Sequence, residues 1–144
     1  MAEQKVSYRY AKAVFESALE ERKIEQFYND FMFVLNILSS VPELMSLAKK
    51  PLISSFRKKK LFHEIFHNSI SEPTLNFILF LVDKNRDYLL KNIIHQFQKL
   101  YYSYKNYLPV EIYLPKDFED GIKNKIVNRI EQNTGMKVVP KFII

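Results

Sequence analysis

The sequence predicts a mainly α protein, in which a six-helix N-terminal bundle is followed by a small, incomplete α/β C-terminal domain. Three observations predict this fold class. Apolar residues recur every three or four positions through residues 1–107, which is the period of an amphipathic helix. The 144 residues include 2 glycines, too few for the many tight turns of an all-β chain. After Pro109 the period changes to alternation, which is typical of a half-buried strand.

The first two helices are predicted over residues 7–23 and 24–40. Ser7 is of a residue type that favours the position just before a helix, so we expect it to cap the first one. The apolar residues of each segment fall on one face of a helix. These inward positions are Ala11, Phe15, Ala18 and Leu19 in the first helix and Phe27, Phe31, Val34, Leu35 and Leu38 in the second.

Four further helices are predicted from their end signals and from the same period. Ser40 and Glu43 have the spacing of a capping box at the start of the third helix, which Pro51 is expected to end. Pro73 fits the first turn of the fifth helix, and Asn85 fits a left-handed position at its end. The third to sixth helices are expected within residues 40–51, 54–68, 71–85 and 87–106.

The C-terminal domain is predicted as a β-α-β unit over residues 108–144. Apolar and polar residues alternate over 110–114, which indicates a strand. Residues 117–135 return to helical spacing with Gly135 as the stop, and 136–144 read as a second strand. A unit of this size is smaller than most domains that fold alone. Its apolar second strand also runs to the last residue, so we expect the domain to be incomplete.

The composition excludes several kinds of functional site. No cysteine is present, which excludes disulfides, thiol nucleophiles and thiolate metal sites. Gly121 and Gly135 stand alone, so no glycine-rich phosphate loop is possible. No run of about 18 apolar residues occurs, and we therefore expect no direct membrane insertion. The N-terminus has no apolar signal core, which predicts a cytoplasmic location.

The stretch HEIFH has the spacing of a zinc-protease site, and a zinc metallopeptidase is one alternative function. His63 and His67 would share one helix face, and Glu64 would act as the general base. A third ligand has to come from Asp87 or Glu72, and nothing else in the sequence marks either residue. We therefore expect two solvated histidines, no catalytic residue, no metal and no cofactor.

A second alternative is a basic helical module that binds nucleic acid. The net charge is +6, and the one dense basic stretch is KKPLISSFRKKK, from Lys49 to Lys60. Charge of this kind attracts nucleic acid or an anionic surface. Charged stretches are more often solvated helix faces, so we expect no nucleic-acid partner.

The first and fifth helices carry more apolar residues than one buried face can hold. The inward face of the fifth helix is expected to hold Leu75, Ile78, Leu79 and Val82. A helix that is apolar most of the way round is buried on two sides. Such a helix is either central in its own bundle, or its outer side binds the amphipathic helix of a partner. The remaining apolar residues, with one polar neighbour, are Tyr10, Ala13, Val14, Asn76, Phe77 and Phe80.

Four stretches of the chain carry a resemblance to a known family. They are RYAKAVFESALEE, PELMSLAKKPLISSFRKKKLFHEIF, TLNFILFLVDKNRDYLLKNIIHQFQKLY and NTGMKV. In this order and spacing the chain resembles the delta subunit of bacterial F-type ATP synthase, in the family of the oligomycin-sensitivity-conferring protein. Two positions depart from the family pattern, because Asn85 and Asp87 stand where the family usually has Gly and Leu.

The resemblance implies a non-catalytic stator subunit of a proton-translocating ATP synthase, peripheral to the cytoplasmic face of the bacterial inner membrane. Residues 1–107 would bind the N-terminal helix of an alpha subunit of the catalytic head, between the first and fifth helices. Residues 108–144 would bind the b subunits of the peripheral stalk. This link would hold the head still, so that rotor torque drives ATP synthesis. Carried over by position, the alpha-subunit contacts would be Tyr10, Ala13, Asn76 and Phe80, with Val14 and Phe77 as neighbours.

Overall fold

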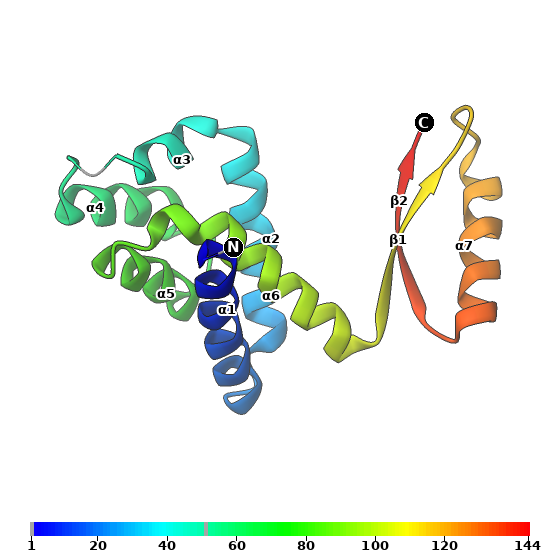
Figure 1. The fold of residues 1–144 in the computed structure, drawn as a ribbon, viewed down its shortest axis with the longest axis horizontal. Coiled ribbons are helices and arrows are strands. Elements are labelled where there is room, and N and C mark those ends of the chain that lie inside the picture. The colour runs from blue at the N-terminus through cyan, green and yellow to red at the C-terminus, as the bar shows by residue number, and fades with distance from the viewer. Residues whose placement is uncertain (1, 51) are drawn as a thin grey trace. The chain divides into compact units, whose positions relative to one another are not determined.

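The computed structural model of this protein describes residues 2–50 and 52–144. The chain divides into two compact units, Met1–Gln98 and Lys99–Ile144, called the first unit and the second unit below. Among the described residues, helices build the first unit, and both strands belong to the second (Figure 1). The predicted fold class, a helical bundle followed by a small α/β part, is confirmed.

The helices follow one another in the predicted order. No single described helix is long and apolar enough to cross a membrane. One pair of consecutive helices, α2 (Ile24–Ser40) and α3 (Pro42–Ala48), meets the length and composition criteria together, but it is bent by 96°. The elements are α1 (Ala2–Glu20), α2 (Ile24–Ser40), α3 (Pro42–Ala48), α4 (Ser55–Phe66), α5 (Glu72–Asp83), the 3-10 helix η1 (Asp87–Leu89) and α6 (Leu90–Lys105).

The core of the first unit contains a cluster of aromatic rings from three helices. The ring centres of Phe31 in α2 and Phe97 in α6 lie 4.9 Å apart, and Phe15 in α1 lies 5.6 Å from Phe97. Both pairs meet edge to face, an arrangement that aromatic rings prefer. All three side chains are buried. The cluster therefore joins α1, α2 and α6 in the interior of the first unit.

Two of the predicted helix starts are wrong. α1 begins five residues before Ser7, which lies inside the helix, is fully buried and cannot act as the cap. Ser40 is the last residue of α2, and α3 begins at Pro42 without a side-chain cap hydrogen bond. Proline lacks a backbone N–H and suits the first position of a helix. Only Val41 lies between α2 and α3, and Ser40 is still part of α2, so Ser40 and Glu43 cannot form a capping box.

Other predicted helix signals are confirmed. Pro73 lies in the first turn of α5. Asn85 follows α5 with φ of 56°, and Gly135 ends the helix of the second unit with φ of 71°. Both are in the left-handed region, which glycine and asparagine adopt at lower cost than other residues. Pro51, which was expected to end α3, lies outside the described residues.

One predicted inward position of α5 is wrong. Leu75, Ile78 and Val82 are buried as expected, but Leu79 is only half-buried and Leu81 is fully buried in its place. The reason is that α5 packs against α2 and η1 as well as against α4. These neighbours draw the buried stripe toward position 81.

The N-terminal end of α5 is held by a carboxylate from α2. Oδ2 of Asp30 accepts hydrogen bonds from the Ser71 backbone N–H at 3.1 Å, the Ser71 hydroxyl at 2.5 Å and the Thr74 hydroxyl at 2.7 Å. Ser71 is the residue that precedes α5, and its own side chain makes no cap hydrogen bond. Asp30 thus ties the start of α5 to α2, and its negative charge suits the positive end of the helix dipole.

The segment after α5 is held by a buried ion pair. Nζ of Lys58 in α4 lies 3.3 Å from Oδ2 of Asp87 in η1, and the two side chains are 9% and 3% exposed. The same ammonium donates a hydrogen bond of 3.0 Å to the backbone oxygen of Ala48 in α3. Buried charges are tolerated when they are paired in this way. Three elements, α3, α4 and η1, thus meet at one lysine.

In the second unit, β1 (Tyr107–Tyr113) and β2 (Lys137–Ile143) pair in parallel, and α7 (Asp120–Thr134) connects them. The two strands and the helix occur in the predicted order. The first strand begins at Tyr107, earlier than the alternation that starts at residue 110 predicts.

α7 covers one face of this two-stranded sheet. Nζ of Lys123 in α7 lies 5.2 Å from the centre of the Phe142 ring in β2. Val138, four residues earlier on the same strand, is buried. Successive residues of a strand point to opposite faces, so Ile143 and its register partner Tyr113 lie on the other face. Tyr113 is 71% exposed.

Candidate functional site

The six residues that the sequence singled out on the first and fifth helices define a surface that we call the α1–α5 surface. The rings of Tyr10 in α1 and Phe80 in α5 meet edge to face, with their centres 6.3 Å apart. The two helices are neighbours in the first unit (Figure 1). Phe80 is 44% exposed and Tyr10 is half-buried. The contact therefore lies at the surface and leaves part of both rings open to solvent.

Two further residues of this surface are exposed. Ala13 lies one turn after Tyr10 on α1, and Asn76 lies one turn before Phe80 on α5. Residues three or four apart share a helix face, so Ala13 and Asn76 extend the Tyr10–Phe80 contact along both helices. A methyl group is small, and the backbone of α1 is accessible to a partner at Ala13.

The last two residues are more deeply placed. Val14 of α1 is 8% exposed and belongs to the buried core of the first unit. Phe77 is half-buried, and its ring lies edge to face with Phe31 of α2 at 5.9 Å between centres. These side chains support the α1–α5 surface from below more than they present themselves to a partner.

Charged groups border the surface at the end of α5. Nζ of Lys84 lies 5.6 Å from the centre of the Phe80 ring, a cation–π distance. Asp83 pairs with Lys59 of α4 at 3.2 Å. The exposed ring thus has a positive neighbour, while the adjacent carboxylate is directed to α4.

The sequence interpretation missed one residue of the α1 stripe. Val6 precedes Tyr10 by one turn and is half-buried. Spacings of four and seven residues place Val6, Tyr10 and Ala13 on one helix face. Its helical spacing was the available signal, but the expected helix start at Ser7 placed Val6 outside the helix.

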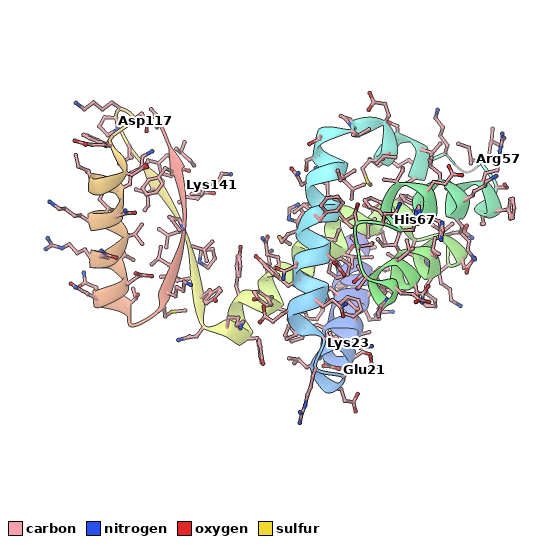
Figure 2. The ribbon with its side chains drawn as sticks, turned by 180° about the vertical axis from the view of Figure 1, so that it is seen from behind. Glu21, Lys23, Arg57, His67, Asp117 and Lys141 are labelled. Carbon is pink, nitrogen blue, oxygen red and sulfur yellow. The ribbon has the colours of Figure 1, made fainter. Side chains whose placement is uncertain are left out.

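His63 and His67, the histidines of HEIFH, are both exposed and lie at the end of α4. Figure 2 labels His67. Their rings are stacked, with centres 4.8 Å apart and planes 7° from parallel. His67 is the residue that follows the helix. Within residues 2–50 and 52–144, no group of three His, Cys, Asp or Glu is placed to hold a metal ion. Neither Glu72 nor Asp87 completes the set that a catalytic zinc site needs.

The basic stretch from Lys49 to Lys60 is partly neutralised by carboxylates. Lys58 is buried against Asp87, and Lys59 pairs with Asp83. The two pairs take positive charge away from the segment that a nucleic-acid-binding module would use.

On the open face of the second unit, Tyr113 forms a hydrogen bond within β1. Its hydroxyl donates to Oε2 of Glu111 at 2.8 Å. This hydrogen bond and the nearby negative charge of Glu111 raise the pKa of the Tyr113 hydroxyl above its ordinary value. Glu111 faces Lys141 in the register of the sheet. Lys141 is exposed (Figure 2), so this face combines an aromatic ring with charges of both signs.

Comparison with known proteins identifies relatives over nearly the whole chain. The family model described as ATP synthase delta (OSCP) subunit matches residues 6–144. The ATP synthase subunit delta of Fusobacterium nucleatum is 30% identical over 138 residues, which cover 96% of this chain and 79% of that protein. That of Clostridium perfringens is 30% identical over 133 residues, covering 92% and 74%. The sodium ion specific delta subunit of Propionigenium modestum is 30% identical over 138 residues, covering 96% and 79%.

A solved structure shows the same fold. A chain of the cryo-EM structure of the Toxoplasma gondii mitochondrial ATP synthase hexamer superposes with a TM-score of 0.80 and 21% sequence identity, covering 96% of this chain and 76% of that one. The likeness to bacterial delta subunits that the sequence motifs predicted is confirmed by the family model and by these relatives. The chain therefore belongs to the ATP synthase delta (OSCP) subunit family and is a structural subunit of such a complex, not an enzyme by itself.

Proposed function

We propose that the chain is the stator subunit that links the catalytic head of an F-type ATP synthase to its peripheral stalk. The first unit binds the amphipathic N-terminal helix of an alpha subunit, and the second unit binds the b subunits. The link prevents the head from turning with the rotor, so that rotor torque does work on the catalytic sites. The coupling ion does not enter this role, because the link is mechanical.

The Tyr10–Phe80 contact is the observation that carries the helix-binding part of the proposal. It joins α1 and α5 at the surface, and Phe80 remains 44% exposed. An amphipathic helix binds by laying its apolar face against such a surface, with anchors one turn apart. Aromatic side chains are frequent energetic anchors at interfaces. Ala13, beside Tyr10, allows the backbone of the incoming helix to approach closely.

The charges around the surface favour one orientation of the partner. Lys84 lies over the Phe80 ring at the C-terminal end of α5. An acidic residue at the matching end of the incoming helix would pair with this ammonium. Such a charge at the rim contributes chiefly to register and association rate, while the apolar contacts supply affinity.

A stator joint has to bind tightly, because a joint that dissociates transmits no torque. Nanomolar affinity corresponds to about 12 kcal/mol of binding free energy. A partly buried aromatic pair with a supporting layer of Val14 and Phe77 suits this requirement.

For the second unit, the proposal rests on the face of the sheet that α7 leaves open. Tyr113 is exposed there, and Glu111 and Lys141 lie beside it in register. A mixed aromatic and charged face is the kind of surface that binds a polar helix end. Attachment to the b subunits places the chain peripherally at the cytoplasmic side of the membrane.

The helix-binding part is tested by titrating the full chain with a synthetic peptide of the N-terminal helix of an alpha subunit. Isothermal calorimetry measures the affinity. We expect saturable binding with one peptide per chain. Ala13→Asp and Phe80→Asp each place a charge in the interface and should remove the binding while far-UV circular dichroism stays unchanged.

Tyr8→Asp is the matched control. Tyr8 lies on another side of α1 and is 43% exposed, close to the 44% of Phe80. The substitution therefore introduces the same charge at an equally exposed aromatic position and should leave peptide affinity unchanged. Normal binding by both Ala13→Asp and Phe80→Asp would show that the helix binds elsewhere.

A further inference from the structure

His63 and His67 are two neighbouring side chains of the type that binds metals, and the proposed stator role does not use them. They lie one turn apart at the end of α4, and both side chains are exposed. The stacking of their rings, 4.8 Å between centres and 7° between planes, gives the two imidazoles a common orientation. Positions i and i+4 face the same side of a helix. In this stacked arrangement the in-plane lone pairs of the two rings are parallel and do not converge, so binding one ion requires the exposed His63 ring to turn about its side-chain bonds toward His67.

A hydrogen bond fixes which nitrogen of His67 is available. Nδ1 of His67 lies 2.9 Å from the backbone oxygen of His63. A carbonyl oxygen only accepts hydrogen bonds, so Nδ1 carries the proton and donates it. In the neutral ring the free lone pair is then on Nε2, which points away from the helix backbone. Histidines that bind metals commonly have their other nitrogen held by a carbonyl in this way.

The pair opens onto a cavity between α4 and α5. The cavity has a volume of about 300 Å³, and its walls include His63, His67, Glu72 and Asn76. Glu72 and Asn76 are exposed polar residues of α5. The other lining residues are Ile70, Leu75 and Leu79, so the space beside the imidazoles has both polar and apolar walls.

We propose that His63 and His67 chelate one divalent transition-metal ion of the class that prefers imidazole ligands, such as Ni²⁺, Cu²⁺ or Zn²⁺. Two ring nitrogens bind the ion at about 2.0–2.1 Å, the usual length of a metal–imidazole bond. Water completes the coordination, because no third His, Cys, Asp or Glu among the described residues is placed as a ligand. Affinity should follow the usual order for nitrogen ligands, with Cu²⁺ bound most tightly.

This chelate is a different site from the metallopeptidase that HEIFH suggested. A peptidase needs three protein ligands and a rigid helix in the core. Here the pair lies on an exposed face, and His67 already follows the last residue of α4. An ion held across positions 63 and 67 instead stabilises the last turn of α4, because it cross-links that turn in the folded chain.

The proposal is tested by titrating the untagged full chain with NiCl₂ in a buffer that does not bind metals, followed by calorimetry. We expect one Ni²⁺ per chain. His63→Ala and His67→Ala should each weaken uptake at least tenfold, since each removes one of two ligands. His95→Ala, which changes the third histidine of the chain in α6, should leave uptake unchanged.

Two further measurements distinguish a chelate from nonspecific binding of the ion to the protein surface. Ni²⁺ should raise the melting temperature of the wild-type chain but not that of the His63→Ala/His67→Ala double variant. Glu72→Gln should bind Ni²⁺ as the wild type does. Equal uptake by the wild type and the double variant, or no uptake by either, would overturn the proposal. A loss in Glu72→Gln as large as that of the histidine variants would overturn the two-imidazole site.

Discussion

The ammonium of Lys58 and the carboxylate of Asp87 form a buried ion pair, 3.3 Å apart, that joins α4 to η1. Lys58 compensates the negative charge of Asp87, which is almost fully buried. Removing one partner of a buried pair leaves the other charged and unpaired. Asp87→Ala should therefore lower the free energy of unfolding by about 3–5 kcal/mol, measured by urea denaturation.

Replacing both partners should restore stability. Lys58→Met with Asp87→Leu substitutes apolar side chains of similar volume for the ion pair, which is often neutral or stabilising. The exposed pair Lys59–Asp83 is the control, with side chains 38% and 52% exposed. Asp83→Ala should cost less than about 1 kcal/mol, because solvent screens that pair. A double variant as unstable as Asp87→Ala would contradict the compensating role of Lys58.

Asn85 should be replaceable by glycine but not by a branched residue. Its φ of 56° lies in the left-handed region, where a β-carbon is unfavourable. Asn85→Gly should keep the urea midpoint close to that of the wild type, while Asn85→Val should cost about 1–2 kcal/mol. Equal midpoints for the two variants would show that the turn after α5 relaxes to another conformation.

The contact of Asp30 with the start of α5 should contribute measurably to stability. Oδ2 accepts three hydrogen bonds, so Asp30→Ala leaves the donors of Ser71 and Thr74 without this acceptor. We expect a loss of about 1–3 kcal/mol in urea denaturation. Asp30→Asn keeps one amide oxygen as acceptor and should lose less. The reverse order of the two variants would argue against an acceptor role.

The hydroxyl of Tyr113 should titrate at higher pH than an ordinary tyrosine. The hydrogen bond to Glu111 and the charge of that carboxylate favour the neutral hydroxyl and raise its pKa. A folded-state pKa above the unfolded one contributes stability that is present below the unfolded value and lost as pH rises through the folded value. The difference between ultraviolet titrations of the wild type and Tyr113→Phe isolates this residue. In a Glu111→Gln background the pKa should fall.

Helical period predicted the order of elements because it is a local property of the sequence. The helix starts that were predicted wrongly depend on contacts with other segments. Ser7 is of a residue type that caps helices, but α1 begins before it and Ser7 is buried inside the first unit. Leu79 and Leu81 are equally apolar, and only the packing of α5 against α2 and η1 decides which is buried. Which of the two residues is buried depends on contacts between segments, and such contacts leave no periodic signal in the sequence.

In the candidate site, too, the sequence predicted the local features and not those that depend on contacts between helices. The apolar surplus located Tyr10 and Phe80 on their helices, and the structure brings their rings together. The direction of Phe77 was not predictable, because it is set by Phe31 on α2. The Lys58–Asp87 pair joins residues from different helices, and its formation requires the folded arrangement of both.

α5 is anchored at both ends by charged groups, Asp30 before its first turn and the Lys58–Asp87 pair just after its last. A force that pulls outward on Phe80 is therefore opposed at both ends of α5, by the contact of Asp30 and by the Lys58–Asp87 pair, which we call the two clamps. Shear along the helix meets resistance from α2 at one clamp and from α4 at the other. A rod clamped in this way behaves as a stiff beam.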